Sequence, residues 1–401
     1  MENGKLSERI LKRSVLRQFH NDNLENKMRS AAVGNDCAFL CSEGGLETAV
    51  NTQTVCFGGS KAGFYAVMQA VNHLAAAGAV PVAISDNITM PTDTDEAQLK
   101  EVVAGIKKAV SYTNAAIRGQ NKERDSKELQ NKEQNNKEQN NIEQNNIEQK
   151  DNDDGSIESA DSRFGVICGH TEISSAVSAP VVSVTAFGKD MKGILFARSE
   201  EDNMQSKASG QTGTYIKKSE VKMRPGQQIV ISKYIGLEGT AILAQKYRDR
   251  LREKLPAKMI DEAAGYEEMI SVLPEAAGAS KSGVCAMHAL SQGGVFGALW
   301  EMAEAAGTGL SINLKAIPVR QETIEICEQL ELNPYRLLSG GSLLMAADDG
   351  ESLAESLIQS GIPAFVIGCA TKGNDRVLVG SEEGERRFLE PVNQEELFGA
   401  L

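Results

Sequence analysis

The segment Gly169-His170-Thr171-Glu172 carries the side chains best suited to chemistry. It closes an apolar run, Phe164 to Cys168, that predicts a buried strand. Histidine, threonine and glutamate at a strand end are costly to bury unless they bind something. The chain has four histidines, of which His73 and His288 also lie in motif-like surroundings. If the segments around His73, His170 and His288 converge in space, they form a site.

A transition-metal site is one alternative for these histidines, because three imidazoles suffice to hold a catalytic zinc ion. Nothing in their spacing requires them to converge. The seven cysteines include no Cys-x-x-Cys pair, and several lie in apolar runs, as Cys168, Cys285 and Cys369 do. That pattern is typical of reduced, buried thiols in a cytoplasmic protein and argues against a disulfide framework or a cysteine-ligated zinc site.

Three glycine-rich turns precede predicted helices. A helix start presents free N–H groups and a partial positive charge, and glycines let a phosphate approach the backbone. The turns are Gly58 to Gly63, Lys233 to Gly239 and His288 to Gly294. The first is not a Walker A motif, because the required spacing is absent. In the second, Lys233 offers a positive charge and Glu238 a metal ligand. The alternative for each turn is an ordinary junction without a ligand.

Asp36 and the pair Asn72-His73 are further candidates. An aspartate leading into a strand suits Mg²⁺, which prefers hard oxygens and usually takes only one or two protein carboxylates. Gln69, Asn72 and His73 share one face of a predicted helix, opposite its apolar stripe. Taken alone, such a face is most often a solvated surface. Taken together, the glycine-rich helix starts and the nearby Asp, His and Glu side chains favour a nucleotide–Mg²⁺ site.

The hydrophobic pattern predicts a mixed α/β chain, and 401 residues favour two domains. Helices are predicted at 64–77, from 95 to at least 110, and near 239–254, 294–306, 320–331 and 351–360. Strands are predicted at 81–85, 164–168, 181–187, 228–232, 343–347, 364–369 and 377–379. The proposed division is an N-terminal domain, 1–188, a linker, 189–224, and a C-terminal domain, 225–401.

A repeated polar five-residue unit fills residues 131–150. It offers too little apolar surface to offset the entropy of ordering, so residues 119–161 are predicted to be a disordered or loosely helical insertion, or alternatively a partner-binding segment. A second polar stretch, 199–219, is predicted to be a mobile loop. No apolar run is long enough to span a membrane, and no apolar signal core opens the chain. Together with the unpaired cysteines, these absences favour a cytoplasmic location. The net charge of −13 argues against general nucleic-acid binding.

The order of these motifs resembles that of the aminoimidazole ribonucleotide (AIR) synthetase-like superfamily. The resemblance rests on Asp36-Cys37-Ala38, Asn72-His73 through Gly78 to Pro81, Gly169 to Glu172, Pro180 to Ser183, Lys233 to Gly239, and His288 to Gly294. Within the superfamily the chain most resembles the HypE-type hydrogenase maturation proteins. The opening Gly4-Lys5-Leu6, the stretch Gly297 to Ala305 and the stretch Ile317 to Arg320 are especially similar to that branch.

The resemblance implies an α/β (α+β) fold of two domains. The N-terminal mixed sheet with its flanking helices would form the core of a homodimer, and the C-terminal domain would be α/β. It also implies ATP and Mg²⁺ in a cleft between domains and subunits. ATP would phosphorylate an amide oxygen or a related acceptor, on a small molecule or a protein tail, by positioning and charge neutralisation. A maturation-complex partner is a further implication.

The resemblance also assigns roles by position. The implied catalytic residues are His170, Glu172, Lys233 and Glu238. The implied nucleotide-binding residues are Asp36, Asn72, His73, Thr171, Gly236, Gly239, His288, Gly293 and Gly294. The implied Mg²⁺ ligands are Asp36 and Glu172.

The chain departs from the family pattern where metal and phosphate are usually held. His73 and Ala289 stand where aspartate is common, and Ser291-Gln292 replaces threonine and a charged residue. Fewer oxygen ligands should weaken triphosphate binding or change the metal preference, since imidazole suits softer ions. HypE-type proteins also end in a cysteine that carries a carbamoyl group, whereas the last cysteine here is Cys369, so cyanide formation on the chain's own tail is not expected. The expected function is an ATP-dependent enzyme, or alternatively a catalytically weakened nucleotide-binding or assembly protein.

Overall fold

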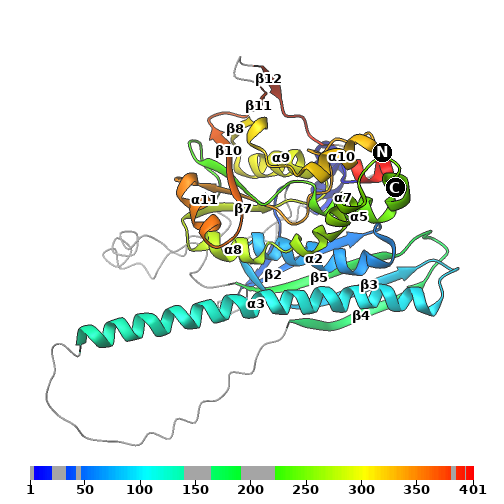
Figure 1. Cartoon of the computed structure of the whole chain (residues 1–401), viewed down its shortest axis with the longest axis horizontal. Coiled ribbons are helices and arrows are strands. Elements are labelled where there is room, and N and C mark those ends of the chain that lie inside the picture. Colours follow the sequence, from blue (N-terminus) through cyan, green and yellow to red (C-terminus); the bar gives the residue numbers. More distant parts are fainter. Residues whose placement is uncertain are drawn as a thin grey trace, which may run out of the picture.

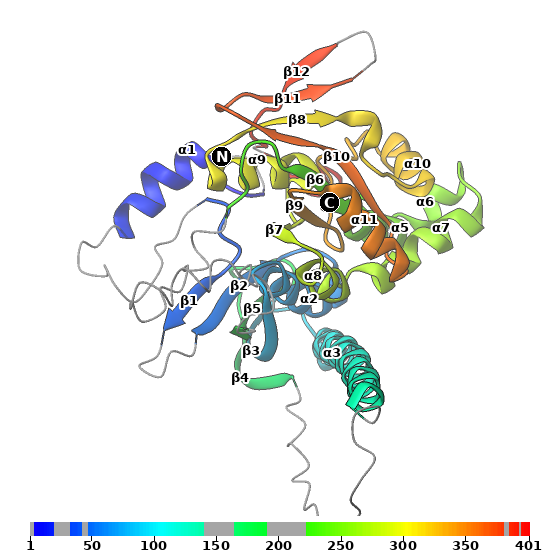
Figure 2. The same cartoon turned by 90° about the vertical axis from the view of Figure 1, so that its left-hand side faces the viewer.

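The structure is a computed structural model, and it describes residues 4–19, 33–41, 47–139, 164–190, 222–380, 385–392 and 394–401. It contains two sheets, a five-stranded one in the order β1-β2-β5-β3-β4 and a seven-stranded one in the order β12-β11-β8-β10-β6-β9-β7. Figures 1 and 2 show helices α2 and α3 beside the first sheet, with the second sheet and its helices on the far side of α2. The predicted two-domain α/β fold is confirmed.

The first sheet belongs to the N-terminal half. Its strands are β1 (Ala38–Cys41), β2 (Glu47–Val55), β3 (Ala79–Met90), β4 (Gly165–Ile173) and β5 (Val181–Asp190). All neighbouring pairs are antiparallel except β3 and β4, which are parallel. The helices are α1 (Glu8–Ile10), α2 (Ala62–Ala76) and α3 (Glu96–Gln139), with short turns η1 (Leu11–Val15), η2 (Leu16–Phe19) and η3 (Gly59–Lys61).

Helix α2 is buried along its whole length. One side packs on β2, β3 and β5, and the other contacts α8 (Leu273–Ser280) and β7 (Val284–Ala289) of the C-terminal half. The apolar stripe therefore meets one sheet while the polar face meets the other domain. The interpretation of Gln69, Asn72 and His73 as a solvated surface is wrong, because these side chains are buried at the domain junction.

The second sheet is formed by the C-terminal half. Its other strands are β6 (Gln228–Ser232), β8 (Gly309–Asn313), β9 (Leu343–Ala347), β10 (Ala364–Thr371), β11 (Arg376–Val379) and β12 (Arg386–Phe388). Its other helices are α5 (Leu237–Lys246), α6 (Arg248–Arg252), α7 (Ala257–Ala264), α9 (Gly294–Ala306), α10 (Gln321–Gln329), α11 (Gly350–Gln359) and α12 (Glu396–Ala400), with turns η5 (Gly265–Met269) and η6 (Leu314–Ala316). One apolar core runs through both halves, and a second lies between this sheet and α9.

Several sequence predictions about local structure need correction. The strand predicted at 164–168 exists as β4, but it is an edge strand whose Val166 and Ile167 are exposed. The helix predicted near 239–254 is interrupted at Tyr247, between α5 and α6. Of the cysteines predicted to be buried, Cys168 is exposed, and Cys285 and Cys369 are half-buried. All six cysteines with described side chains are free thiols.

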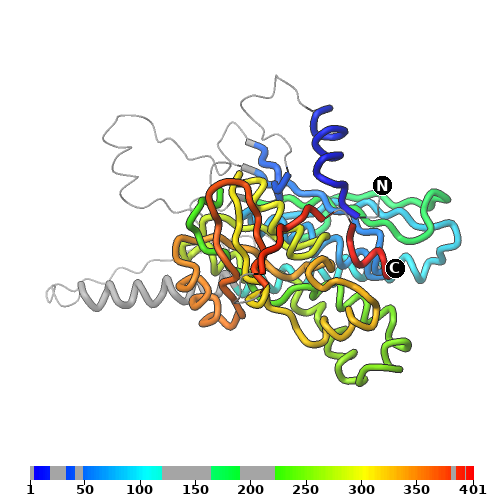
Figure 3. The backbone as a smooth tube through the Cα atoms, turned by 90° about the horizontal axis from the view of Figure 1, so that it is seen from above, coloured from blue at the N-terminus to red at the C-terminus, as the bar shows by residue number. Residues whose placement is uncertain are grey.

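The structure describes only part of the two polar insertions. Helix α3 continues to Gln139, so the described beginning of segment 119–161 is helical, whereas residues 140–163 and the predicted loop 199–219 lie outside the described residues. Among the helices that the structure describes, none is long and apolar enough to cross a membrane. Figure 3 shows the first and last described segments side by side, and Gly4 contacts Glu395 there.

Candidate functional site

A cavity of about 370 Å³ lies where the first described segment, the start of β1, α2, β7 and α9 meet. Asp36, His73, His288 and Gly293 all line it, and they come from three separate motifs, because His288 and Gly293 share one turn. The other polar residues of its lining include Lys5, Glu8, Asn51, Gln53, Gln292, Glu301, Gln394 and Glu395. Three of the sequence motifs therefore converge in space.

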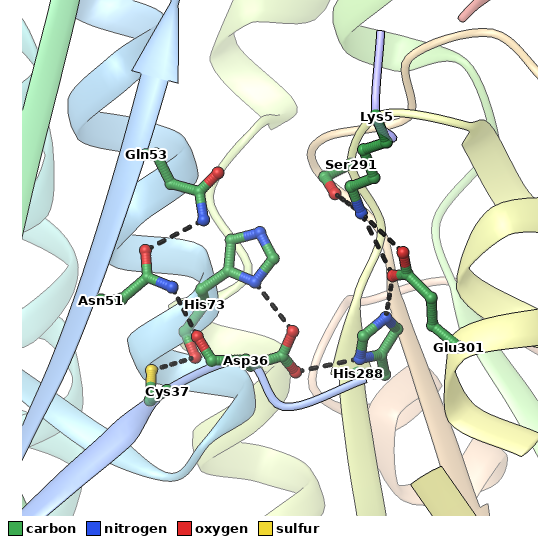
Figure 4. Close-up of polar contacts among 9 residues, drawn as sticks. All are labelled: Lys5, Asp36, Cys37, Asn51, Gln53, His73, His288, Ser291 and Glu301. Carbon is green, nitrogen blue, oxygen red and sulfur yellow. Dashed lines mark hydrogen bonds and ion pairs between the residues drawn. The ribbon is translucent and has the colours of Figure 1, made fainter. Parts of the chain in front are cut away.

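Asp36 is the centre of this cavity (Figure 4), and its side chain is only 6% exposed. Its Oδ1 atom lies 2.8 Å from Nδ1 of His73, and its Oδ2 atom lies 3.1 Å from Nδ1 of His288. Asn51 donates its side-chain N–H to the backbone oxygen of Asp36. Gly34, at φ 78°, brings this segment against α9, because a Cβ there would collide with the backbone oxygen of Glu301.

His288 links Asp36 to a second ion pair. Its Nε2 atom lies 3.1 Å from Oε2 of Glu301, and Lys5 donates to the two oxygens of Glu301 at 3.0 and 3.1 Å. Lys5 Nζ also lies 3.4 Å from Oγ of Ser291. Both ring nitrogens of His288 face carboxylate oxygens, so both donate and the ring is an imidazolium.

The pKa values agree with this assignment. Burial lowers the pKa of His288, but the charges of Asp36 and Glu301 outweigh burial and raise that pKa to about 10. Burial raises the pKa of Glu301, but Lys5 and His288 outweigh it and lower that pKa to about 2. Burial also opposes ionisation of Asp36, yet His288 and His73 hold its pKa well below the usual range. Anions and cations therefore alternate along Asp36, His288, Glu301 and Lys5 near neutral pH.

The turn before α9 holds a different carboxylate. Gly293 has φ 87° and is the N-cap residue of α9, and its N–H donates to Oε2 of Glu395. Oε1 of Glu395 accepts from the N–H groups of Leu338, at 2.7 Å, and Leu397, at 3.2 Å. Burial raises the pKa of Glu395 to about 7, although the three N–H groups act in the opposite direction. Gly294, at φ 62°, packs its Cα against the backbone of Tyr335, where a Cβ would collide.

The second predicted turn does not reach the cavity. The Lys233 side chain donates to the backbone oxygens of Met269 and Ser271 at 2.6 and 2.7 Å, and it lies 2.5 Å from Oε1 of Glu275. The backbone N–H of Gly236 donates to Oγ of Ser339 at 2.8 Å. Every one of these partners is internal, so the turn faces the protein itself.

Glu238 and Gly239 complete that turn. Glu238 is fully buried, and its Oε1 atom accepts from Nε2 of Gln69 at 2.8 Å. Burial raises the pKa of Glu238 to about 8, and the charge of Glu395 adds to this effect, with Gln69 and the backbone of Gly340 opposing it. Gly239 lets α5 approach Leu337, because a Cβ would collide with that side chain. Glu238 therefore joins the two domains, whereas the close contact of Gly239 lies within the C-terminal half.

The side chain of Asn72 is also hydrogen-bonded at the domain junction. Its Nδ2 atom donates to the backbone oxygen of Ile270 at 2.8 Å, and its Oδ1 atom accepts from the N–H of Val272 at 3.0 Å. Because adjacent helical residues point in different directions, His73 faces the cavity while Asn72 holds the segment that leads into α8.

The segment that first suggested chemistry lies elsewhere. His170, Thr171 and Glu172 are exposed on β4, at the opposite edge of the sheet from β1. His170 is 67% exposed, and its Nε2 atom lies 3.6 Å from Oε2 of Glu172. Two of the three candidate histidines, His73 and His288, therefore converge on Asp36, and the structure does not bring His170 to them within the chain.

The metal ligands inferred from the resemblance do not meet within one chain either. Both carboxylate oxygens of Asp36 are engaged by histidines, and Glu172 is on the far edge of the sheet. Within the described ranges, no group of three or more His, Cys, Asp and Glu side chains is arranged to hold a metal ion. The donor set of this chain thus does not fit a Mg²⁺ ion held by Asp36 and Glu172.

Sequence reasoning did not assign a site role to Glu301, Lys5 or Glu395. A signal for Glu301 was present, because Gly293, Gly297 and Glu301 recur every four residues and so share one face of α9. Lys5 lies in an opening that is similar to the HypE-type branch, but its partner is 296 positions away. Glu395 gave no local signal, since its partners are backbone N–H groups of distant turns.

Comparison with known proteins identifies related sequences. Residues 34–130 match the model of the AIR synthase related protein N-terminal domain, and residues 224–380 match that of the C-terminal domain. The chain is 32% identical to the carbamoyl dehydratase HypE of Rhodobacter capsulatus over 133 residues, which cover 33% of this chain and 37% of that protein. It is 22% identical to a putative hydrogenase expression/formation protein of Methanocaldococcus jannaschii over 397 residues, covering 97% of this chain and 95% of the relative.

Solved structures with the same fold include HypE proteins. A HypE–HypF complex aligns with a TM-score of 0.62 at 15% identity and covers 95% of this chain and 99% of the other chain. A HypE in complex with ATP aligns with a TM-score of 0.55 at 17% identity and covers 98% of this chain and 97% of the other. At these identities the likeness concerns the fold.

Proposed function

Because the chain belongs to the AIR synthase-related family and is of the HypE type, we propose that it binds ATP in the cavity around Asp36. The ATP would be used to phosphorylate, and so activate, the oxygen of an amide or a related acceptor. One observation carries the proposal: Asp36, His73 and the pair His288 and Gly293 come from three separate motifs and line one cavity.

The residues of the cavity have distinct tasks in this proposal. Bound ATP would supply the phosphoryl group that turns a poor leaving oxygen into a phosphate. The imidazolium of His288 and the ammonium of Lys5 are fixed positive charges for an anion, and the positive end of the α9 dipole lies at Gly293. Asp36 positions both histidines by accepting from each ring. The carboxylates of Asp36 and Glu172 do not meet within the chain, so they would not hold a Mg²⁺ ion together.

A homodimer would complete this arrangement at β4. That strand is an edge of its sheet, and its Val166, Ile167 and Ile173 are exposed. Unpaired strand edges with apolar side chains favour pairing with another chain. A second copy on β4 would also cover His170 and Glu172. The substitution Ile167→Lys should shift the sedimentation coefficient toward the monomer, and an unchanged value would contradict dimerisation through β4.

The second candidate is a nucleotide-binding or assembly protein of the same fold with little or no catalysis. Three observations favour it: Asp36 has no free carboxylate oxygen, Ala289 offers no side-chain ligand, and Glu395 occupies the N–H of Gly293. Four acids, Glu8, Asp36, Glu301 and Glu395, also line the cavity, which opposes a triphosphate. A protein with the same fold has been solved in a HypE–HypF complex. A maturation-complex partner is therefore compatible with both candidate functions.

Calorimetric binding of ATP, ADP and AMP, with and without Mg²⁺, tests both candidates, followed by ADP release over a panel of amides. ATP binding without turnover by any amide would support the second candidate. An absence of ATP binding would contradict both.

Two histidine variants locate the site. His288→Gln should weaken ATP binding at least tenfold, because it removes the buried imidazolium. His170→Gln, on exposed β4, should change the affinity less than twofold. Thermal melts of both variants check that they are folded. Equal losses in the two folded variants would place the nucleotide elsewhere.

A further inference from the structure

The carboxylate of Glu395 occupies donors that an anionic ligand would use. It accepts from the N–H of Gly293 at the start of α9 and from the N–H of Leu338 in the loop before β9. A carboxylate and a phosphate can bind the same donors, since both are anions that accept charge-assisted hydrogen bonds from N–H groups. The chain thus places its own anion in the cavity that contains Asp36 and His288.

The segment that carries Glu395 is held by contacts outside the cavity. Leu397 is fully buried in the core, and the Phe398 ring packs edge-on against Phe57 with their centroids 5.9 Å apart. Lys246 donates to the backbone oxygen of Leu401 at 3.1 Å. These anchors hold α12 in place, so Glu395 is presented to the cavity from one side.

The first described segment closes over Glu395 from the other side. Gly4, at φ 117°, approaches the backbone of Glu395 so closely that a Cβ on Gly4 would lie 3.0 Å from it. The neighbouring Lys5 attracts the Glu395 carboxylate electrostatically while it donates to Glu301. An anion that takes the place of Glu395 would therefore keep the positive charge of Lys5 and recover the N–H of Gly293.

The position of Glu395 is unfavourable for a purely structural helix cap. Its charge also acts on a second buried acid, because it raises the pKa of Glu238. Burial keeps the pKa of Glu395 near 7 despite three N–H donors. A buried carboxylate that is costly to ionise is easier to displace than one with a cationic partner.

We propose that the segment before α12, Gln394 and Glu395, acts as an intramolecular plug, in which Glu395 competes with the phosphate groups of the nucleotide for the N–H group of Gly293. The plug regulates the site assigned above, so it rests on the proposed ATP binding. Nucleotide binding then requires Glu395 to leave its N–H donors, and the segment before α12 moves away from α9.

The test compares Glu395→Ala and Glu395→Gln with wild type in calorimetric titrations with ATP and with inorganic pyrophosphate. Both variants remove the competing charge, and both should bind each anion about tenfold more tightly, which corresponds to about 1.4 kcal/mol. The matched control is Glu396→Gln, whose carboxylate accepts from the N–H of Asn333 at 3.3 Å outside the cavity lining. The control should change neither affinity by more than twofold.

Hydrogen exchange of wild type gives a second readout that needs no variant. Exchange of the Leu397 amide, whose N–H loses Glu395 as its acceptor, should rise when ATP saturates the protein, because the plug has left the cavity. A structural cap would instead give a lower melting temperature for Glu395→Ala with unchanged affinities and unchanged exchange.

The outcomes separate the plug from the proposed function. If wild type binds ATP but neither variant gains affinity and exchange is unchanged, the plug is overturned and ATP binding stands. If Glu395→Ala gains affinity for pyrophosphate while ATP does not bind, the plug stands and the ATP proposal fails. If neither anion binds any form of the protein, both are overturned.

Discussion

Asp36 and Glu238 are both buried carboxylic acids, and the resemblance assigned both to the site. Asp36 contacts two imidazoles, His73 and His288, whereas Glu238 contacts the amide of Gln69. Burial raises the pKa of each, yet the net result is opposite. The histidines lower the pKa of Asp36 well below its usual range, and the pKa of Glu238 rises to about 8.

The difference shows that burial alone does not determine what a buried acid can do. The partner decides whether the acid is ionised, and so whether it contributes a charge to a site. Asp36 is an anion at the centre of a cavity. Glu238 is mostly protonated near neutral pH and joins α5 to α2 by a hydrogen bond. Only the first has the electrostatic character of a ligand-binding residue.

The largest expected effect is that of Asp36→Asn, which leaves the buried imidazolium of His288 with Glu301 as its only carboxylate partner. Breaking a buried ion pair from one side costs about 3–5 kcal/mol. Urea denaturation at pH 7 should show a loss of free energy of unfolding of that size. The exposed acid Asp93, changed to Asn, is the control and should cost less than about 0.5 kcal/mol. A loss below about 1 kcal/mol in Asp36→Asn would contradict the ionised network.

The second effect is a pH dependence caused by Glu238. Its pKa in the folded protein, about 8, exceeds the ordinary value of 4.5 for a glutamate, so the folded state keeps a proton that the unfolded state has released. The free energy of unfolding should therefore fall as the pH rises from about 5 to 8, by about 3 kcal/mol from this group. Glu395 acts in the same direction up to pH of about 7.

The substitution Glu238→Gln isolates this contribution. Gln cannot ionise, so urea denaturation across the pH range should show a flatter curve and a more stable protein at pH 8 than wild type. The control is Glu328→Gln, on the exposed face of α10, which should leave the slope unchanged. A wild-type slope retained in Glu238→Gln would mean that Glu238 is not protonated when buried.

The smallest effect concerns an acid–histidine pair without burial. His170 and Glu172 lie 3.6 Å apart on exposed β4. Exposed ion pairs contribute about 0–1 kcal/mol, so a double-mutant cycle with His170→Ala and Glu172→Gln should give a coupling energy below about 0.5 kcal/mol. A coupling above about 1 kcal/mol would show that water is excluded from the pair, as a second subunit on β4 would do.

The sequence predicted the elements well because hydrophobic period and turn residues are local signals. β9 has the predicted bounds, Leu343–Ala347, and α9 covers the predicted 294–306. The sequence also predicted that His73 and His288 belong to one site. It did not predict that His170 lies on an edge strand, because an apolar run predicts a strand but not its place in the sheet, so a site role for His170 stays a prediction.

The roles of the charged residues depended on contacts that no local pattern encodes. Lys233 resembles a phosphate-binding lysine by position, but three acceptors in the chain from Met269 to Glu275 engage it. The pairing of Lys5 with Glu301 joins residues that are 296 positions apart. These partners come together only when the distant parts of the chain pack against one another. That packing depends on the shape of surfaces formed by many residues, which no local pattern encodes.

The position of Asn72 has a consequence for thermal unfolding. Both atoms of its amide are used by a segment of the other domain, on a helix that has no exposed side. Neither half can melt first without exposing α2, so thermal unfolding should be one cooperative transition and not two. The binding free energy of any ligand in the cavity is then shared by the whole chain through linkage, and a single midpoint rises when the ligand is added.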